Sequence, residues 1–376
     1  NWAPTDWLRF RGTYGTSFRA PALFEQFLGE EKSFIAQRSI DPCIRWQANL
    51  AAGNISQRVA DNCAMPNVRP NNNSPIGIPV AHTGAGISAE VIGIGGIGTL
   101  DPETSKAKTA SIILTPRFGF LPDTRVSLAV DYFDIEVKGE ITRLGAANII
   151  GRCYSSEDFP NDPLCSLFTR GQVITAPFNI SSVNDRFINI ASQVNRGFDV
   201  TGNIRHNFGG WMGSMNLLAN MTWQTKDTQA LFADDVENLN GEIGSPKFVG
   251  DFNLTWQPRG GWTLFYGMDV IGGADSETDT IEDQGGLCVV DNPPIIRGDV
   301  CFDMNVPATF YHSASISKEI GKKFELTLGL SNIFDTRPPR ISVVGNNIVS
   351  MMGPVVATSQ YEFVGRRVFL NVMRRF

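Results

Sequence analysis

The residues best suited to covalent chemistry are six cysteines, which fall into three local couples. The stretch within each couple is rich in Asn, Asp, Pro or Gly, and no couple has the C-x-x-C spacing of a zinc or redox site. Because His82, His206 and His312 lie far apart, we expect no metal site and no cofactor. We predict three loop-closing disulfides in an oxidising compartment outside the cytoplasm; the alternative is six buried free thiols in a cytosolic protein. The predicted pairs are Cys43 with Cys63, Cys153 with Cys165, and Cys288 with Cys301.

Two short motifs are similar to cofactor or catalytic sequences. Residues 93–98 match G-x-G-x-x-G, but residues 99–102 contain Asp101-Pro102 where a dinucleotide site needs a helix. Ser315 and Lys318 match S-x-x-K, whose chemistry needs a helical turn to bring the two side chains together. On a strand these two side chains face opposite sides. We therefore expect no enzyme.

Acidic stretches offer oxygen atoms of the kind that Ca²⁺ prefers. They are residues 274–284, and Asp234-Asp235 with Glu237. We favour solvated loop charge for both and leave Ca²⁺ binding open. The net charge is -6 and the basic residues are scattered, which argues against nucleic-acid binding.

The elements that carry these residues are predicted to be strands. Ten segments alternate apolar and polar side chains with the period of two of a half-buried strand. No stretch approaches the roughly 18 apolar residues of a membrane helix. The segments are residues 8–18, 109–116, 125–132, 197–208, 215–223, 247–256, 262–270, 310–317, 323–331 and 367–376.

Short and long connections alternate along the chain. The turns near residues 120, 210, 260 and 321 carry the Gly or Pro that tight turns need. All three cysteine couples fall in long connections, which is typical of an all-β, antiparallel, up-and-down barrel with its long loops at one end. The long connections are about 24–104, 139–187, 225–245, 273–306 and 335–358.

The composition of the two strand faces favours a transmembrane barrel over a soluble sandwich. The polar faces carry Asn, Thr, Ser, Asp and Arg, whereas a sandwich exposed to water favours Lys and Glu. Aromatic residues lie near strand ends, where a membrane interface places amphipathic rings. These residues are Tyr14, Tyr132, Trp223, Trp256 and Trp262. A final strand that ends at Phe376 would be an exposed edge in water, but in a closed barrel it pairs with the first strand.

Four stretches resemble the TonB-dependent outer-membrane receptors, in the order expected for that family and spread over the whole chain. They are residues 11–27 with Phe18-Arg19-Ala20-Pro21 and Glu25; Leu100-Asp101-Pro102-Glu103-Thr104-Ser105; Leu330-Ser331-Asn332-Ile333-Phe334-Asp335; and residues 361–376 with Gly365-Arg366-Arg367. The terminal Phe376 is similar to the aromatic end that outer-membrane assembly machinery recognises.

The resemblance implies a plug domain followed by a barrel of about 22 strands. Residues 1–376 would then be about ten C-terminal strands, with the plug, the TonB box and about a dozen strands absent. We expect these parts upstream in a longer natural chain or in a second polypeptide. The implied location is the bacterial outer membrane, with extracellular long loops and a periplasmic C-terminus.

The implied function is TonB-driven active uptake of a scarce nutrient. The implied partners are the TonB complex, the plug and remaining barrel strands, outer-membrane lipid and a small-molecule nutrient. The ligand stays open between an oligosaccharide or other organic nutrient, which we slightly prefer, and a ferric siderophore. Competing hypotheses are a disulfide-stapled surface adhesin or secreted β-sandwich binding protein, and an outer-membrane enzyme. The last is disfavoured because no Ser, His and Asp cluster lies on one face of neighbouring predicted strands.

Two sets of residues are candidates for contacts. Charged residues predicted to face the lumen would hydrogen-bond the plug or hydrate the lumen, because a charge there needs a partner or water. They are Arg9, Arg11, Asp199, Arg205, Lys247, Asp251 and Glu325. The ligand-contact candidates surround the first disulfide, and they are Arg38, Arg45, Trp46 and Arg58.

Overall fold

The structure is a computed structural model, which describes residues 1–66, 77–171, 174–232, 234–278, 281, 288–289, 300–321, 323–342, 355–356 and 360–374. The predicted assembly signal, Phe376, lies outside the described residues, as do residues 279–280 and 282–284 of the acidic stretch.

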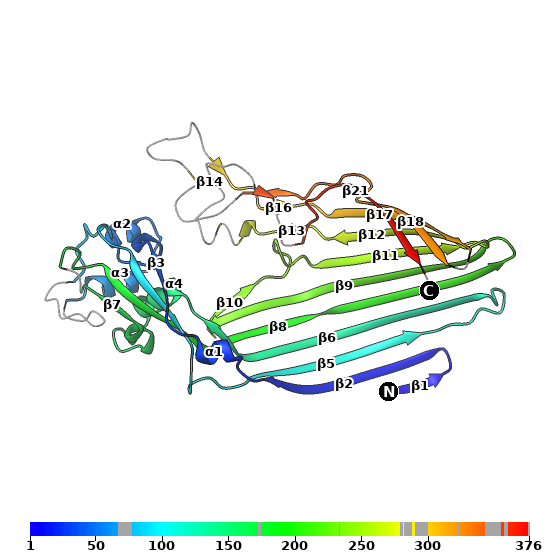
Figure 1. The fold of residues 1–376 in the computed structure, drawn as a ribbon. Helices are drawn as coiled ribbons and strands as arrows, with labels where there is room; N and C mark the ends of the chain where they lie inside the picture. Colours follow the sequence, from blue (N-terminus) through cyan, green and yellow to red (C-terminus); the bar gives the residue numbers. More distant parts are fainter. Residues whose placement is uncertain are drawn as a thin grey trace.

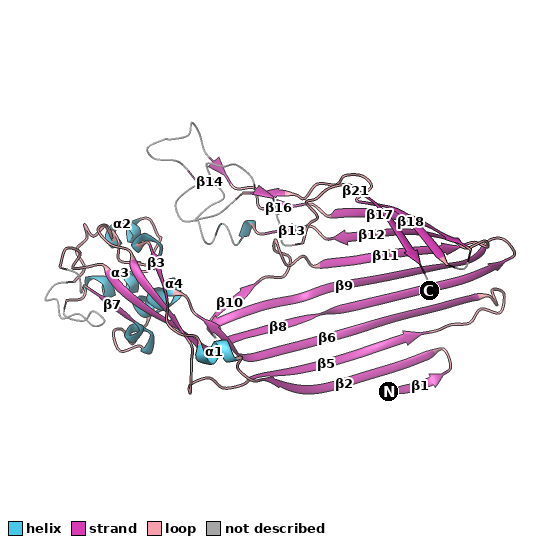
Figure 2. Ribbon diagram, in the orientation of Figure 1, coloured by secondary structure: helices cyan, strands magenta, loops and turns pink. Residues whose placement is uncertain are grey.

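One large antiparallel sheet forms most of the chain, and the ten predicted strands are confirmed (Figures 1 and 2). β1 is a further strand at one edge, where it pairs with β2, and it was not predicted because it is short. The sheet is open, with β1 and β21 at its edges. In order across the sheet the strands are β1 (Trp2–Thr5), β2 (Leu8–Arg19), β5 (Glu103–Leu114), β6 (Thr124–Arg143), β8 (Ile180–Gly209), β9 (Gly213–Phe232), β11 (Phe248–Gln257), β12 (Trp262–Ile271), β17 (Thr309–Ile320), β18 (Phe324–Ser331) and β21 (Arg367–Arg374).

Tight turns gather at one end of the sheet and long connections at the other, as predicted (Figure 1). β6, β8 and β9 run further than the sequence pattern indicated, so the predicted loop 139–187 includes the end of β6 and the start of β8. Their extra length is paired into ladders of hydrogen bonds. Among the described residues no helix is long and apolar enough to cross a membrane.

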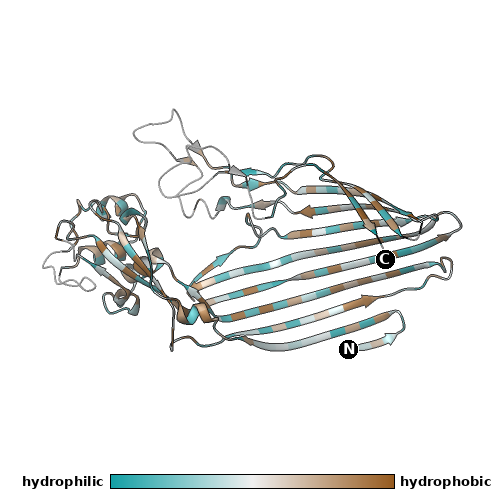
Figure 3. Cartoon of the chain, viewed as in Figure 1, coloured by the Kyte–Doolittle hydropathy of each residue, from teal (hydrophilic) through white to brown (hydrophobic). Residues whose placement is uncertain are grey.

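The two faces of the sheet differ in chemistry, and the alternation is visible along the long central strands in Figure 3. In the centre of the sheet Val130 of β6 lies opposite Val200 of β8, which lies opposite Met221 of β9. The neighbouring register places Asp131 opposite Asp199 on the other face. We call these the apolar face and the polar face, because successive side chains on a strand point to opposite sides.

The long connections are not simple loops, since much of residues 31–94 and 144–191 folds into a small unit that we call the loop domain. In it β3 pairs with β4, and β4 pairs in parallel with the first residues of β8. Its core includes Ile149, Tyr154 and Val183 together with the disulfides Cys43–Cys63 and Cys153–Cys165. Its elements are β3 (Glu31–Ile35), η1 (Gln37–Ser39), α2 (Trp46–Ala51), α3 (Gln57–Ala64), β4 (Ala89–Ile94), α4 (Ala146–Ser155), η2 (Pro163–Leu167) and β7 (Phe168–Arg170).

Short elements complete the end of the sheet that carries the long connections. The third predicted disulfide, Cys288–Cys301, joins β14 to β15, so all three predicted pairs are present. The remaining elements are α1 (Leu23–Phe27), β10 (Asp235–Asn238), β13 (Ala274–Asp275), β14 (Cys288–Val289), β15 (Val300–Cys301), β16 (Asn305–Val306), β19 (Arg340–Ile341) and β20 (Val355–Val356).

The close approach of an aromatic ring to a glycine supports pairing at the β21 edge. Gly329 of β18 lies opposite Phe369 of β21, and a Cβ atom built at Gly329 would lie 2.1 Å from Cζ of Phe369. The ring therefore covers the glycine, and any side chain at this position must displace it.

We predict that Gly329→Val destabilises the sheet by roughly 1–3 kcal/mol, because it overpacks this contact. The measurement is denaturant unfolding in detergent micelles followed by tryptophan fluorescence. Gly202→Val is the matched control, since a Cβ atom at Gly202 meets nothing within 4 Å. Equal unfolding midpoints for the two variants would contradict the predicted contact.

Candidate functional site

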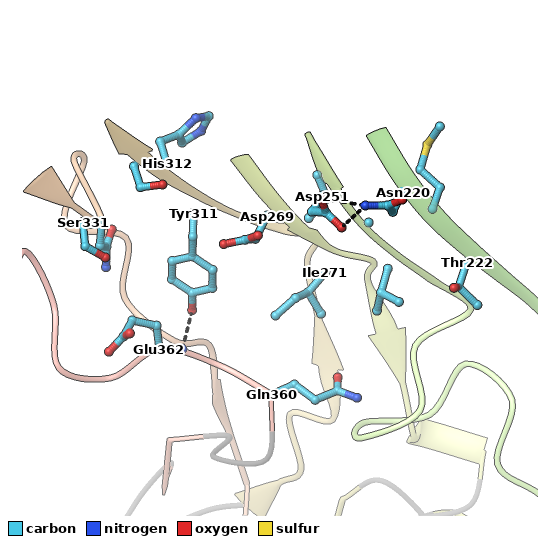
Figure 4. Close-up of a pocket in the computed structure, with 16 residues that line it drawn as sticks. Asn220, Thr222, Asp251, Asp269, Ile271, Tyr311, His312, Ser331, Gln360 and Glu362 are labelled. Carbon is cyan, nitrogen blue, oxygen red and sulfur yellow. Dashed lines mark hydrogen bonds between the residues drawn. The ribbon is translucent and has the colours of Figure 1, made fainter. Parts of the chain in front are cut away.

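A polar cavity lies on the polar face where β9, β11, β12 and β17 meet the segment that precedes β21 (Figure 4). Asp251 and Asp269 occupy directly opposite positions of β11 and β12, and Asp269 lies opposite Tyr311 of β17. Figure 4 shows the ring of Tyr311 on the cavity side and the ring of His312 pointing the other way. His312 instead contacts Tyr266 across the strands, with Nδ1 2.7 Å from the Tyr266 hydroxyl oxygen.

Amide side chains hold Asp251 in this cavity. Asn220 Nδ2 donates to both Asp251 carboxylate oxygens, at 3.3 and 3.2 Å, and Asn253 Nδ2 donates to Oδ2 at 2.6 Å. The Tyr311 hydroxyl accepts the backbone N–H of Glu362 at 3.1 Å, which ties the segment before β21 to the wall. Like charges directly opposite each other on a sheet repel. Asp251 and Asp269 thus present an acceptor surface suited to cationic, amide or hydroxyl groups.

The cavity is lined by carboxylate, amide and hydroxyl side chains. In the part of the chain that the structure describes, no group of three or more His, Cys, Asp or Glu side chains is placed to hold a metal ion. The cavity offers carboxylates, amide side chains and the hydroxyls of Thr222, Tyr311, Ser313 and Ser331. These groups are suited to recognition of a polar solute by hydrogen bonds.

Further charged side chains lie on the polar face of β2, β6 and β8. Arg11 Nη2 donates to Asp131 Oδ1 at 3.0 Å, and Thr222 Oγ1 donates to Asp199 Oδ1 at 2.7 Å. Toward the tight turns, Arg125 and Arg205 lie directly opposite each other and line a hollow with Arg259. The polar wall therefore carries carboxylates at mid-height and guanidinium groups near the turns.

A network of charged side chains joins the outer end of the sheet to α1. Arg19 Nε donates to Glu103 Oε2 at 2.7 Å, and its Nη2 donates to Glu25 Oε1 at 3.0 Å. Glu103 also accepts the backbone N–H of Ile141, and Glu25 accepts that of Ala22 at the start of α1. This network fixes the point at which β2 turns into α1.

The G-x-G-x-x-G stretch belongs to the same junction. The Gly96 N–H donates to the carbonyl of Glu25, and the Gly95 N–H donates to the carbonyl of Leu28. A Cβ atom at Gly95 would lie 2.4 Å from the carbonyl oxygen of Gln26. These glycines are needed because their backbone passes close to the backbone of α1, so the stretch serves close packing of the two segments.

A buried ion pair connects two distant parts of the loop domain. Arg170 Nη1 and Nη2 each donate to one carboxylate oxygen of Asp41 at 2.7 Å, and His82 Nε2 lies 3.0 Å from Asp41 Oδ2. Both ionic side chains are completely shielded from water. Burial alone would raise the pKa of Asp41, but the Arg170 charge and the hydrogen bonds from His82 and Arg170 hold that pKa at about 2.

Comparisons with known proteins identify the family. The family model described as "TonB dependent receptor-like, beta-barrel" matches residues 1–333. The chain belongs to the TonB-dependent receptor family. No curated protein sequence matches it.

Solved structures of other receptors are similar to this chain. A mutant of the ferric enterobactin receptor PfeA from Pseudomonas aeruginosa, in complex with enterobactin, is 14% identical, with a TM-score of 0.54 over 99% of this chain and 39% of that one. The siderophore receptor PirA from Acinetobacter baumannii is 12% identical, with a TM-score of 0.49 over 100% of this chain and 40% of that one. The receptor chain therefore spans well under half the length of these structures.

The receptor's predicted lumen residues are distributed along the polar wall rather than gathered in one site. Asp251 lies in the cavity of Figure 4, and Arg11 and Asp199 are held by the contacts above. Arg205 lines the hollow near the turns, and Arg9 is exposed opposite Ile113. Lys247 lies just before β11, over Gly241, and Glu325 lies opposite Glu319 near the turn end of β18.

The predicted ligand-contact residues of the receptor all lie in the loop domain, but their side chains differ in availability. Arg38 and Arg45 are exposed. The indole N–H of Trp46 donates to the carbonyl of Ile78 at 2.9 Å, and Arg58 pairs with Glu157 at 2.7 Å. A role in ligand contact stays a prediction for all four.

Asp269, Asp131 and Glu362 are polar-wall residues that the sequence interpretation missed. Asp131 and Asp269 fall on the polar parity of predicted strands, so the same alternation that indicated Asp251 contained the signal. Glu362 follows a long connection and had no such pattern. The acidic residues Asp234 and Asp235 each pair with Arg152 at 2.8 Å.

We predict that Arg170→Met destabilises the loop domain by about 3–5 kcal/mol, because it leaves a buried carboxylate without its main partner. Most of the loss should disappear in the Asp41→Leu/Arg170→Met variant, which removes both charges. The measurement is the protease concentration needed to cleave the loop domain in detergent. Arg58→Met is the control, since the pair with Glu157 is solvent-exposed and worth less than about 1 kcal/mol.

The Asp41 pKa predicts an acid-sensitive loop domain. The folded pKa of about 2 lies below the usual unfolded value. Asp41 therefore stabilises the domain fully at neutral pH, and this stabilisation is lost as the pH falls from about 4 to 2. Hydrogen exchange of the core amides against pH checks this expectation. The Asp41→Asn variant should lose that part of the pH dependence, and an unchanged acid slope in this variant would rule it out.

Proposed function

We propose that the chain forms part of the wall of an outer-membrane transporter that takes up a scarce small-molecule nutrient, driven by TonB. The observation that carries this proposal is a single-layer sheet with one exposed apolar face and one polar face rich in hydrogen-bonding groups. Family membership supports the same class of function. The proposed role needs binding and passage of a solute, and no covalent chemistry.

The exposure of the apolar face supports a membrane location. Leu328, Val368 and Leu370 are 50%, 70% and 66% exposed. In water an apolar surface of this extent would cause aggregation, whereas in a bilayer it contacts lipid. The adhesin or sandwich alternative requires a second sheet packed about 10 Å away on this face. The exposed side chains of the described strands argue against such packing.

The polar face supports the presence of a polypeptide plug in the lumen, which the family implies. Asp251, Asp269 and Arg125 lie in hollows that a plug would contact or that water would fill. Both edges of the sheet are open, and the related structures are more than twice as long. We infer that further strands close the barrel to about 22 strands and that TonB acts through the plug.

The loop domain supports binding of the nutrient at the extracellular end. Two disulfides and a buried ion pair hold it rigid, and binding residues are commonly placed on loops that a rigid scaffold positions. The exposed Arg38 and Arg45 are the contact candidates there. The fold is shared with a ferric enterobactin receptor at 14% identity, so we keep a ferric siderophore and an oligosaccharide as the two ligand classes.

Cell fractionation and uptake assays test this function. We expect the full receptor in the outer-membrane fraction, with gel migration in detergent that changes on boiling. Cells that carry the receptor should accumulate a radiolabelled ferric catechol siderophore or a radiolabelled maltooligosaccharide, and a protonophore should stop that uptake. Cells without the receptor gene are the control. A receptor recovered in a soluble fraction without detergent would contradict the proposal.

A further inference from the structure

A belt of charged side chains crosses the apolar face near the long connections. The cross-strand registers place Lys108 of β5 opposite Asp134 of β6, which lies opposite Arg196 of β8, which lies opposite Lys226 of β9. Two residues further along each strand, away from the tight turns, Lys106 lies opposite Glu136. We call the following residues the basic belt: Lys106, Lys108, Asp134, Glu136, Lys138, Arg196 and Lys226.

An aromatic row borders the basic belt on the side of the tight turns. Tyr132 packs on Phe198 with ring centroids 5.4 Å apart, and Trp223 packs on Phe248 at 6.0 Å. From this row to His206, β8 covers the roughly 9–11 residues that a tilted strand needs to span a bilayer. Aromatic rows of this kind mark the membrane interface. The basic belt therefore lies at the level of the lipid headgroups on the extracellular side.

Positive charge exceeds negative charge in the basic belt. Asp134 accepts from Arg196 Nε at 2.7 Å, and Glu136 pairs with Lys138 at 3.0 Å, so each carboxylate already has a cationic partner. Arg196 and Lys226 lie directly opposite each other, and like charges in this arrangement repel. Lys106 and Lys108 are exposed, and among the described residues the structure gives their ammonium groups and that of Lys226 no hydrogen-bonded partner.

The position of the basic belt limits what can neutralise it. Its side chains point away from the polar face, so neither a plug nor a solute in the lumen can reach them. A lysine at the opposite membrane edge behaves differently, since Lys318 stacks 4.5 Å from the ring centre of Trp262 and donates to the carbonyl of Gly260. The protein thus supplies partners for Lys318, whereas the basic belt presents its lysines to the lipid side.

We propose that the basic belt binds the phosphate groups of a phosphorylated glycolipid in the outer leaflet of the membrane. Phosphates complement the excess positive charge, and the adjoining aromatic row contacts the upper acyl chains. Lys106, Lys108 and Lys226 hold the phosphates, while Asp134 and Glu136 orient Arg196 and Lys138. This inference rests on the proposed outer-membrane location.

The test compares lipid affinities of the full receptor purified in detergent. The probe is lipid A with both phosphates, titrated in native mass spectrometry. The Lys106→Gln/Lys108→Gln/Lys226→Gln variant should bind on the order of 100-fold more weakly, at roughly fivefold for each lysine near a headgroup. The corresponding triple Lys→Arg variant should keep the wild-type affinity. Lys318→Gln is the matched control on the same face, and it should also bind as the wild type does.

Lipid specificity provides a second criterion that does not depend on any variant. Wild-type receptor should bind dephosphorylated lipid A and phosphatidylglycerol far more weakly than lipid A. Equal affinity for either of these lipids, or wild-type affinity in a folded triple Gln variant, would overturn the inference. If the receptor fractionates with the outer membrane in that case, only the lipid site fails. If it fractionates as a soluble protein, the proposed function fails as well.

Discussion

The arrangement depends on one constraint, which is that backbone N–H and C=O groups in a lipid environment must bond to each other. The antiparallel ladders from β2 to β18 meet this constraint between neighbouring strands. Because strand pairing fixes the register, it also fixes which side chains face lipid and which face the lumen. The functional groups of the wall are therefore restricted to alternate positions, and Asp251 and Phe252 serve different surroundings although they are adjacent in sequence.

Outside the bilayer the constraint changes, because water can form hydrogen bonds with exposed backbone groups. A segment that folds there must be stabilised by a local core of its own. The loop domain forms this core with two disulfides and the Asp41–Arg170 pair. A buried ion pair adds little net stability compared with apolar packing, but losing one partner is costly. Such a pair discriminates strongly between correct and incorrect docking of the two segments, which suits a domain assembled from two separate connections.

Sequence alone predicted the features that depend on residues close together in the sequence. The strands follow from a period of two within each segment, and the three disulfides follow from couples separated by 20, 12 and 13 residues. The Arg170–Asp41 pair spans 129 residues, and the parallel pairing of β4 with β8 joins similarly distant segments. No local pattern indicates such contacts. On the polar wall, Asp251 was predicted and Asp269 was missed, although the register that places them opposite each other was implicit in the alternation.

The junction of β2 with α1 explains why the sequence indicates the family of the protein but not its ligand. Among the residues that carry the family resemblance, Arg19 donates to both Glu25 and Glu103, and these contacts fix the exit of the chain from the sheet. This junction is a contact within the chain and does not depend on which solute the receptor binds. The proposed ligand contacts instead involve exposed side chains of the loop domain such as Arg38 and Arg45. The family motifs therefore indicate the architecture of the barrel wall and do not indicate which solute it binds.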